Sequence, residues 1–311
     1  MKILQYNIYF GEHRGVSLSD RLQNVCGCIM EQNADVVCVQ EVLRDSYSLM
    51  TALLKDMYPY AYPDPQDGIE IAYGTAIFSK FPIKRATTHK FEFTSMGRDI
   101  KLVMVEDDKN SKYYICNVHF ESEFKDKCMK KIYQYSRCSD ILYHLHKKTN
   151  IPVILCADTN VCNDSSKAFH EAFSFAKGWR DAWIENGSSK ATELTFDSET
   201  NPILLSRYGD LNEGAKQKYK SRLDRVLHLS NMHMIDFKLV GADNTKILSD
   251  HYGIVCDISQ NKPETRGDYI PPYISPNNRP RTKDVKAILE AGTKDVKPKT
   301  TGQRVPTKKL F

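Results

Sequence analysis

Asp158 and Asn160 stand two residues apart just after a short apolar run, residues 151–157, and are the first candidates for chemistry. A short run rich in β-branched residues is typical of a central strand covered on both faces. Because successive strand residues point to opposite faces, these two side chains share one face while Thr159 points away. A carboxylate beside an amide that both donates and accepts suits a hydrated cation or a phosphate. The alternative is an ordinary turn, where Asp and Asn are favoured.

Six further polar residues have the chemistry to act with this pair, and four of them follow or lie within strand-like apolar runs. The six are Asn7, Glu41, His119, Asp224, Asp250 and His251. A glutamate at the end of an apolar strand is costly to bury unless a cation such as Mg²⁺ or Mn²⁺ binds it, with a salt-bridged Glu41 as the alternative. Asp224 and Asp250 would support His251, because an aspartate bonded to one ring nitrogen fixes the tautomer and favours the charged form.

In order and spacing, these motifs resemble the endonuclease/exonuclease/phosphatase superfamily and, within it, the 5′-tyrosyl-DNA phosphodiesterase branch. The resemblance runs from Ile3 to about Ile258 and rests mainly on Q-E-V, H-x-E-S, D-T-N and S-D-H-x-G. It implies a four-layered α/β sandwich, in which two mixed β-sheets pack face to face with helices outside. The active site would lie at one end of the sheets. We therefore expect a catalytic domain over residues 1–259.

Hydrophobic periodicity indicates the elements that must position these residues. Apolar residues recur at helical spacing within Leu18–Gln32 and predict a helix packed on a sheet. Further predicted elements are strands at residues 2–10, 34–42, 113–120, 222–229 and 248–258 and a helix at residues 129–145. Residues 73–81 and 101–106 are expected to pair in the first sheet. Residues 201–221 are expected to form a mobile loop or a solvated excursion.

The resemblance assigns metal binding to Glu41 as the principal ligand, with water molecules filling most other positions around Mg²⁺ or Mn²⁺. Asn7 would ligate the metal or orient water and phosphate beside it. The sequence leaves open whether one or two metal ions act. The resemblance thus implies a metal-dependent phosphodiesterase.

The resemblance also implies how the other residues act on a phosphodiester. Asp158 would orient or deprotonate the attacking water. Asn160, His119 and His251 would stabilise the charge that develops on the phosphate oxygens. Sequence alone does not decide which group takes the proton of the water.

Arg98, Ser122 and Phe196 are the expected substrate contacts. Arg98 would face the substrate phosphate, with a solvated surface arginine as the alternative, and Phe196 takes the place of a tryptophan that flanks the substrate in relatives. The chain departs from the family pattern at two points. Tyr9 stands where many relatives carry an acid, and residues 123–124 replace a Thr-Arg pair that includes a cation suited to phosphate.

For the reaction, the resemblance implies hydrolysis of 5′-phosphotyrosyl bonds between DNA ends and protein in DNA repair, with RNA-linked tyrosine as a second substrate. A tyrosine phenol, with a pKa near 10, leaves more readily than an alkoxide, so a site without a strong general acid can still expel it. Two other classes stay open. A nuclease, phosphoinositide phosphatase or sphingomyelinase of the same superfamily would keep the catalytic residues. An inactive binding protein would be expected to lack Glu41, Asp158 or His251, and all three are present.

Composition limits where such a protein works. The 311-residue chain is 41% hydrophobic, which is ample for a core. No apolar run reaches the roughly 18 residues that span a membrane, and Met1 lies almost inside the first predicted strand, so a signal peptide is not expected. The nine cysteines lack metal-site spacing and fit a reducing compartment. We expect a monomer of the nucleus or cytoplasm, neither secreted nor stably associated with a membrane.

Residues 260–311 differ in composition from the rest of the chain. They carry 12 Lys and Arg against 5 Asp and Glu, so residues 1–259 have a net charge of −2 although the whole chain carries +5. Few aliphatic residues are present, and such a segment buries too little surface to offset its chain entropy. We expect a disordered basic tail that contacts nucleic acid or simply aids solubility.

Truncation after Ser259 is expected to preserve hydrolysis of a small chromogenic phosphodiester, because the tail holds none of the candidate site residues. Binding to long DNA should weaken, and the difference between the two proteins should shrink as salt rises. A colorimetric assay measures kcat/KM for the small phosphodiester, and titration of labelled DNA measures Kd for long DNA. Loss of small-substrate hydrolysis on truncation would place the tail inside the catalytic body.

Overall fold

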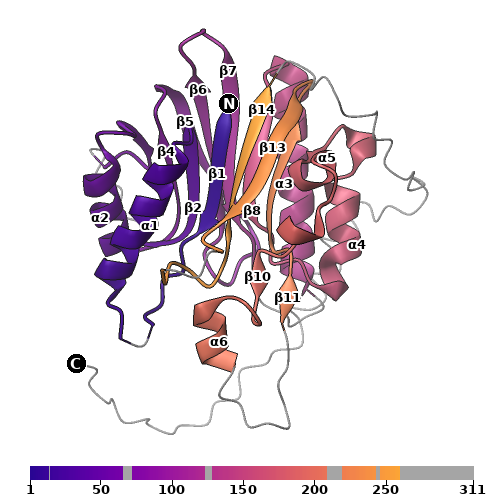
Figure 1. Ribbon diagram of the computed structural model, residues 1–311. Coiled ribbons are helices and arrows are strands. Elements are labelled where there is room, and N and C mark those ends of the chain that lie inside the picture. Colours follow the sequence, from indigo (N-terminus) through magenta and orange to yellow (C-terminus); the bar gives the residue numbers. More distant parts are fainter. Residues whose placement is uncertain (14, 66–71, 123–127, 209–218, 243–245, 260–311) are drawn as a thin grey trace, which may run out of the picture. The chain divides into compact units, whose positions relative to one another are not determined.

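The structure is a computed structural model that describes residues 1–13, 15–65, 72–122, 128–208, 219–242 and 246–259 (Figure 1). The predicted tail, residues 260–311, lies outside the described residues. Residues 123–124, which depart from the family pattern, also lie outside them. The catalytic domain predicted over residues 1–259 therefore stays a prediction at its C-terminal boundary.

A first six-stranded sheet contains the strand that opens the chain. Its order is β13-β14-β1-β2-β4-β3, and β1 and β2 are parallel while the other neighbours are antiparallel. The strands are β1 (Lys2–Asn7), β2 (Val36–Leu43), β3 (Tyr60–Tyr62), β4 (Tyr73–Ser79), β13 (His233–Val240) and β14 (Gly253–Ser259). The central strands β1 and β2 are buried on both faces, as in a doubly covered sheet.

A second six-stranded sheet packs against the first. Its order is β5-β6-β7-β8-β12-β9, and again one central pair, β7 and β8, is parallel. The strands are β5 (Ile83–Lys90), β6 (Asp99–Glu106), β7 (Lys112–His119), β8 (Val153–Asp158), β9 (Arg180–Asp181) and β12 (Asp224–Leu229). A separate two-stranded ribbon joins β10 (Phe196–Asp197) to β11 (Lys220–Ser221).

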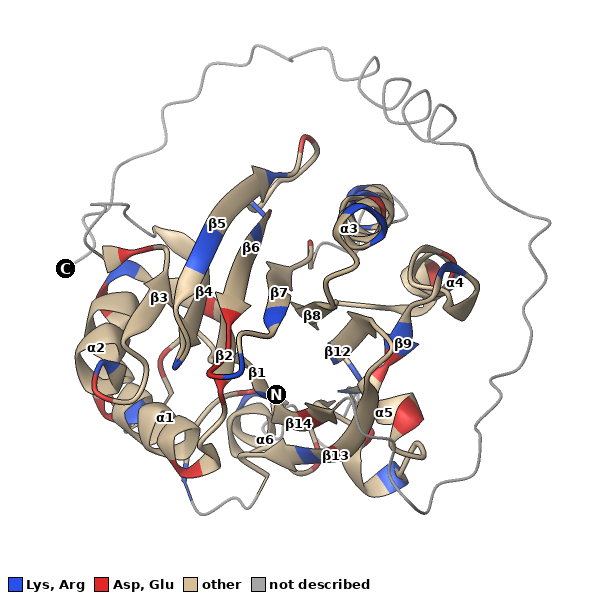
Figure 2. Ribbon diagram, turned by 90° about the horizontal axis from the view of Figure 1, so that it is seen from above, with Lys and Arg blue, Asp and Glu red and all other residues tan. Residues whose placement is uncertain are grey.

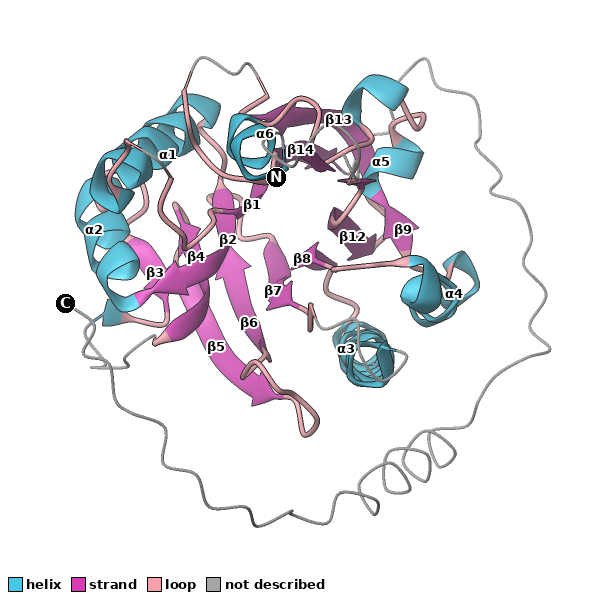
Figure 3. Ribbon diagram, turned by 90° about the horizontal axis from the view of Figure 1, so that it is seen from below, coloured by secondary structure: helices cyan, strands magenta, loops and turns pink. Residues whose placement is uncertain are grey.

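Helices cover the outer faces of both sheets. Figure 3 shows α1 (Leu18–Gln32) and α2 (Arg44–Leu54) on one outer side, and α3 (Met129–Thr149) and α4 (Asn163–Ala172) on the other. The remaining helices are α5 (Ala182–Glu185), α6 (Pro202–Tyr208) and two 3-10 turns, η3 (Phe175–Lys177) and η4 (Lys190–Thr192). The predicted four-layered α/β sandwich is confirmed. Lys and Arg are interspersed with Asp and Glu on α1, α2 and α3 (Figure 2).

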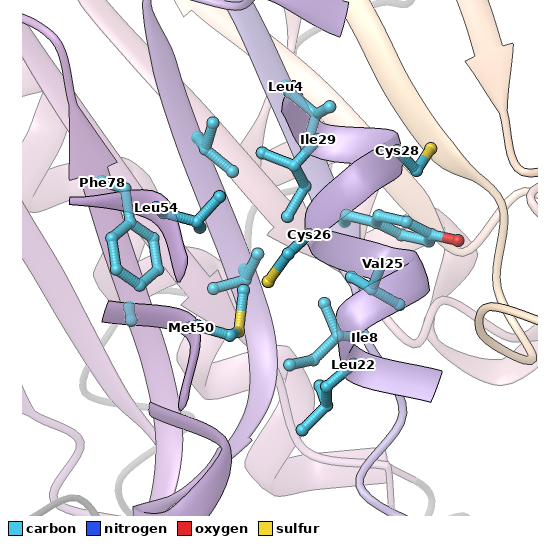
Figure 4. Close-up of a cluster of buried hydrophobic side chains, with 14 of the residues drawn as sticks. Leu4, Ile8, Leu22, Val25, Cys26, Cys28, Ile29, Met50, Leu54 and Phe78 are labelled. Atoms are coloured by element: carbon cyan, nitrogen blue, oxygen red, sulfur yellow. The ribbon is translucent and has the colours of Figure 1, made fainter. Parts of the chain in front are cut away.

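Helix α1 shows how local sequence sets these layers. Its bounds are those that the periodicity predicts, and Ser17 caps it by accepting a hydrogen bond from the backbone of Asp20. Asn33 ends it in a left-handed conformation, which asparagine tolerates. The apolar stripe of the helix, which includes Val25 and Ile29, faces the first sheet and packs with residues of β1 and α2 (Figure 4).

Two predictions about elements are wrong. Residues 73–79 and 99–106 are strands, but they lie in different sheets, because β5 intervenes in the sequence and pairs with β6 instead. Most β5 side chains are exposed, so its hydrophobic pattern gives little signal. Residues 201–221 were expected to form a mobile loop or a solvated excursion, but helix α6 forms in their first part because Asn201 accepts hydrogen bonds from the backbone of Ile203 and Leu204 and both of those side chains are buried. Residues 209–218 of this segment lie outside the described residues.

None of the helices in the described residues is both long and apolar enough to cross a membrane.

The apolar layer between the two sheets should dominate stability. Ile154 of β8 is 0% exposed in that layer, whereas Ile235 of β13 is 37% exposed. Ile154→Ala is expected to lower the free energy of unfolding by about 2–5 kcal/mol, because it removes buried methyl groups and leaves a cavity. Ile235→Ala, the matched control, should cost about 1 kcal/mol or less. Urea unfolding measures both, and equal losses would contradict the assignment of the core.

Candidate active site

The candidate site lies where the central strands of the two sheets end. In the second sheet, Asp158 at the end of β8 is paired with His119 on one side and with Asp224 on the other. In the first sheet, Asn7 ends β1 and Glu41 lies at a register shift between β2 and β4. Glu41 has a φ of 61°, which is uncommon for a residue with a side chain and marks a direction imposed by its surroundings.

Asn7 joins the two sheets through its side-chain amide. Its nitrogen donates to Glu41 Oε1 at 3.1 Å and to Asp158 Oδ2 at 2.8 Å, while its oxygen accepts from the backbone of Tyr9 at 3.0 Å. The second oxygen of Glu41 accepts from the backbone of Phe10 at 3.1 Å. The amide nitrogen of Asn7, rather than its oxygen, thus faces the carboxylates. Such an arrangement suits the orientation of other groups better than direct metal ligation.

The carboxyl of Glu41 is buried, and its surroundings disfavour the charged form. Burial and the charge of Asp250 raise the pKa of its carboxyl, and His251 and the hydrogen bonds from Asn7 and Phe10 lower it, which leaves the pKa at about 6. Hydrogen bonds alone therefore do not offset the burial of this carboxylate.

His251 is held by Asp224, the pairing that the sequence predicts. Its Nδ1 lies 2.7 Å from Asp224 Oδ2, and its Nε2 lies 3.9 Å from Asp158 Oδ2. Burial by itself lowers the pKa of His251, but Asp224, Asp158 and Asp250 together raise it well above its usual value. The ring is therefore an imidazolium at neutral pH. Phe196 packs edge-on against it, with ring centroids 5.1 Å apart.

His119 has the opposite protonation state. Its Nδ1 lies 3.0 Å from a guanidinium nitrogen of Arg98, and arginine only donates, so Nδ1 accepts and the proton is on Nε2. That Nε2 lies 3.3 Å from Asp158 Oδ2. Burial, Arg98 and His251 lower the pKa of His119 and Asp158 raises it, which leaves the pKa at about 3. A neutral donor and a charged donor thus approach the same carboxylate oxygen.

Arg98 is not the solvated surface arginine that the sequence left open. It is 4% exposed and donates to the hydroxyl of Tyr73 at 3.1 Å as well as contacting His119. Burial raises the pKa of Tyr73 to about 12, so this hydroxyl stays protonated. Ser122 lies at the same edge, with its hydroxyl 3.1 Å from the sulfur of Met96.

Asn160 uses its side chain within the loop that follows β8. Its backbone N–H donates to Asp158 Oδ1 at 3.0 Å, and its amide nitrogen donates to the carbonyl of Phe120 at 3.1 Å. The ammonium of Lys131 donates to the Asn160 carbonyl at 2.7 Å. Asn160 therefore fixes the orientation of Asp158 and links the ends of β7 and β8.

Tyr9 and Arg207 form a contact that sequence reasoning missed. Arg207 donates to the hydroxyl of Tyr9 at 2.6 Å and to Asp250 Oδ2 at 3.3 Å, and both Arg207 and Arg21 stack on the Tyr9 ring at 5.1 and 5.2 Å. Burial raises the pKa of Asp250. The only signal in the sequence was the tyrosine in place of an acid, and the distant Arg207 could not be matched to it.

A chain of buried amides between the sheets was also missed. Gln5 donates to Asp224 at 2.9 Å and to Gln40 at 2.8 Å, and Gln40 donates to Asn117 at 2.7 Å. Asn117 in turn donates to backbone carbonyls of β2 and β4. Since Gln40 directly precedes Glu41, the network fixes both the aspartate that holds His251 and the strand that carries Glu41. Polar residues that alternate along β1 were the one feature of the sequence that could have indicated this network.

The donor set fits a hard divalent cation. Among the described residues, Asp158, Asp224 and His251 place potential ligand atoms within 4.8 Å of one another. Nδ1 of His251 is at hydrogen-bonding distance from Asp224, so this group also reads as a hydrogen-bonded triad. Carboxylate oxygens are the ligands that Mg²⁺ and Mn²⁺ prefer, and the buried Glu41 offers two more. The ligand assignment to Glu41 and Asn7 stays a prediction.

Comparisons with known proteins agree with this geometry. The sequence model of the Endonuclease/Exonuclease/phosphatase family matches residues 4–251. TDP2 of C. elegans has a similar fold at 23% identity and a TM-score of 0.68, over 83% of this chain and 74% of that one. D. rerio TDP2, complexed with single strand DNA product, is 19% identical with a TM-score of 0.66, over 83% of this chain and 98% of that one. A Bacteroides thetaiotaomicron mannosyl-6-phosphatase is 16% identical with a TM-score of 0.63, over 83% of this chain and 99% of that one. No curated protein matches the sequence.

The packed sheets, with buried carboxylates and imidazoles at their ends, define an enzyme that hydrolyses phosphate esters. The chain belongs to the Endonuclease/Exonuclease/phosphatase family, whose model covers most of its length. The resemblance to this superfamily that the motifs indicate is confirmed.

The raised pKa of Glu41 predicts a pH-dependent stability in metal-free protein. In the folded state its carboxyl ionises near pH 6 instead of 4.5, so ionisation costs free energy that the unfolded chain does not incur. This stability is present below about pH 4.5 and is lost as pH rises through about 6. Relative to wild type, Glu41→Gln should therefore gain about 2 kcal/mol between pH 4.5 and pH 7.

Urea unfolding at several pH values measures this difference. The matched control is Glu31→Gln, which removes the same charge from a side chain that is 65% exposed. A Glu41→Gln difference that does not change with pH, or that changes no more than the control, would show that Glu41 ionises as freely as in the unfolded chain.

Proposed function

We propose that the protein is a divalent-metal-dependent phosphodiesterase that hydrolyses 5′-phosphotyrosyl bonds between DNA ends and protein and leaves a 5′-phosphate. RNA-linked tyrosine is a second substrate. One observation carries the proposal: the Nε2 atoms of His119 and His251 approach a single oxygen of Asp158 at 3.3 and 3.9 Å, in opposite protonation states. Two N–H donors beside a carboxylate suit a phosphate with a water aligned to attack it.

The chain's own groups divide the work as follows. Asp158 accepts a hydrogen bond from the attacking water and orients it toward phosphorus. Nε2–H of His119 and Nε2–H of His251 donate to the nonbridging phosphate oxygens as their charge grows. Asn7 fixes Asp158 by donating to its Oδ2. The water oxygen bonds to phosphorus and loses one proton to Asp158 or to solvent, the bond from phosphorus to the phenolic oxygen breaks, and the phenolate leaves with the electron pair and takes up a proton from solvent.

A divalent cation fits at Glu41, where it would neutralise phosphate charge. Mg²⁺ and Mn²⁺ both suit these oxygen ligands, and Glu41 remains the proposed principal ligand with Asn7 beside it.

The protonation states of the histidines support a phenol as the leaving group. The pKa of His119 is too low for this ring to carry a proton that it could give to the leaving group, and Asp224, Asp158 and Asp250 hold the charge of His251, which this proposal assigns to the phosphate oxygens. A phenolate of pKa near 10 can leave unprotonated, whereas an alkoxide cannot do so readily. Near the site, Phe196 packs on His251, and Phe10 is 48% exposed with its ring edge-on to Tyr73. These rings offer flat apolar surfaces to a base or a phenol.

The partners and location follow from this substrate. DNA 5′ ends that carry a tyrosyl adduct would be bound by a monomer in the nucleus or cytoplasm. Ser122 and Phe196 remain the proposed substrate contacts. Arg98, expected to face the substrate phosphate, is instead proposed to act through His119, since its guanidinium is buried against that ring.

The decisive comparison sets five substrates at equal concentration with Mg²⁺: 5′-tyrosyl DNA, 5′-seryl DNA of the same sequence, abasic duplex DNA, a phosphoinositide and sphingomyelin. We expect kcat/KM for tyrosyl DNA to exceed each of the others by at least about 100-fold. The seryl arm is the matched control, because it changes only the leaving group. All turnover should stop in EDTA.

Faster cleavage of the abasic duplex or of either lipid would reassign the substrate while leaving the phosphoesterase chemistry in place. Equal rates on tyrosyl and seryl DNA would show that a general acid protonates the leaving group, contrary to the assignment of the two histidines.

A further inference from the structure

Cysteine 162 differs from the other cysteines of the chain. All nine cysteines lie in the described residues, and eight of them are buried while Cys162 is partly exposed. It directly precedes α4 and follows the Asp158–Asn160 loop by two residues. Solvent access is the first requirement for a thiol that reacts with a dissolved oxidant.

Cys162 has a second thiol within reach. Its sulfur lies 3.4 Å from the sulfur of Cys128, which directly precedes α3 and is 2% exposed. The two residues are 34 positions apart in the chain, so the contact results from the fold. A disulfide is about 2.05 Å long, so the sulfur atoms need to approach by little more than 1 Å.

The surroundings of Cys162 favour its thiolate. The ammonium of Lys131 lies 4.0 Å from its sulfur, and the hydroxyl of Ser165 lies 3.4 Å away. The sulfur also sits at the N-terminus of the ten-residue helix α4, where backbone N–H groups favour negative charge. Burial raises the pKa of Cys162, but Ser165, Cys128 and Lys131 outweigh it, so that the net shift is downward.

Other cysteines that lie near one another show the contrast. Burial raises the pKa of Cys116 and of Cys156 well above the usual value, and both are 0% exposed beside further thiols. Burial also raises the pKa of Cys128 to about 11. Proximity of thiols alone is therefore common in this core, whereas proximity combined with exposure and a neighbouring cation is found at Cys162.

We propose that Cys162 and Cys128 form a peroxide-sensitive dithiol that closes to an intramolecular disulfide beside the active site. The thiolate of Cys162 attacks one oxygen of hydrogen peroxide, the O–O bond breaks, and the departing hydroxide takes a proton to form water. Cys162 is then a sulfenic acid. Cys128 loses its proton, its sulfur attacks that of Cys162, and the S–O bond breaks to release a second water. Two thiols are oxidised and one peroxide is reduced.

The disulfide would act on the loop that carries Asn160. Lys131 donates to the carbonyl of Asn160 and also faces the sulfur of Cys162, so it links the thiol pair to the loop after β8. Conversion of the thiolate to a neutral disulfide removes one partner of this ammonium. This inference does not depend on the proposed substrate, because it rests on the thiol pair and its neighbours.

Peptide mapping of the full chain tests the proposal without any variant. Reduced protein is treated with a limiting amount of hydrogen peroxide, the remaining thiols are alkylated, and the peptides are analysed by mass spectrometry. We expect a Cys128–Cys162 disulfide as the main product, reversed by dithiothreitol. In untreated protein, Cys162 should be alkylated at least about tenfold faster than any other cysteine at pH 7.

Two variants separate the roles of the sulfurs. In Cys128→Ser, a cyclic 1,3-diketone should trap Cys162 as a sulfenic acid, and in Cys162→Ser, Cys128 should stay reduced at the same peroxide dose. Cys26→Ala, which removes a buried thiol elsewhere, is the matched control and should leave the disulfide yield unchanged. Alkylation of Cys162 no faster than that of the buried cysteines, or oxidation that yields only intermolecular disulfides, would overturn the proposal.

Discussion

The hydrogen bond from Asn7 to Asp158 is the contact on which the site depends, because its two residues come from different sheets. The amide donates to Glu41 at the same time, so a single side chain sets the positions of two buried carboxylates. The Gln5–Asp224 and Gln40–Asn117 hydrogen bonds cross the same interface further inside. Buried polar groups without partners would cost about 1–3 kcal/mol each, so these bonds also fix how the sheets are aligned.

This alignment explains why two chemically identical rings behave differently. His251 has a carboxylate on Nδ1 and is charged, whereas His119 has a guanidinium on Nδ1 and is neutral. Both present an N–H to the place beside Asp158, where each can donate to a phosphate oxygen. The site is therefore built to stabilise charge on phosphate, and the ease with which the leaving group departs limits the choice of substrate.

Sequence reasoning succeeded where chemistry and periodicity coincide. Helix α1 and the strands that end in Asn7 and Asp158 follow from apolar patterns, and the family was evident from motif order. It failed where a contact joins distant residues with no shared pattern: the exposed strand β5, the amide chain from Gln5, and the pairing of Tyr9 with Arg207. Protonation states were also out of reach, since they depend on the partner of each ring nitrogen.

The account holds that one active site is assembled from both sheets, and hydrolysis of a small chromogenic phosphodiester by two single variants tests it most directly. Glu41→Gln changes a residue of the first sheet and Asp158→Asn one of the second. With Mg²⁺ present, each should lower kcat/KM by at least about 100-fold while far-UV circular dichroism stays unchanged. Wild-type turnover by either variant would contradict a shared site.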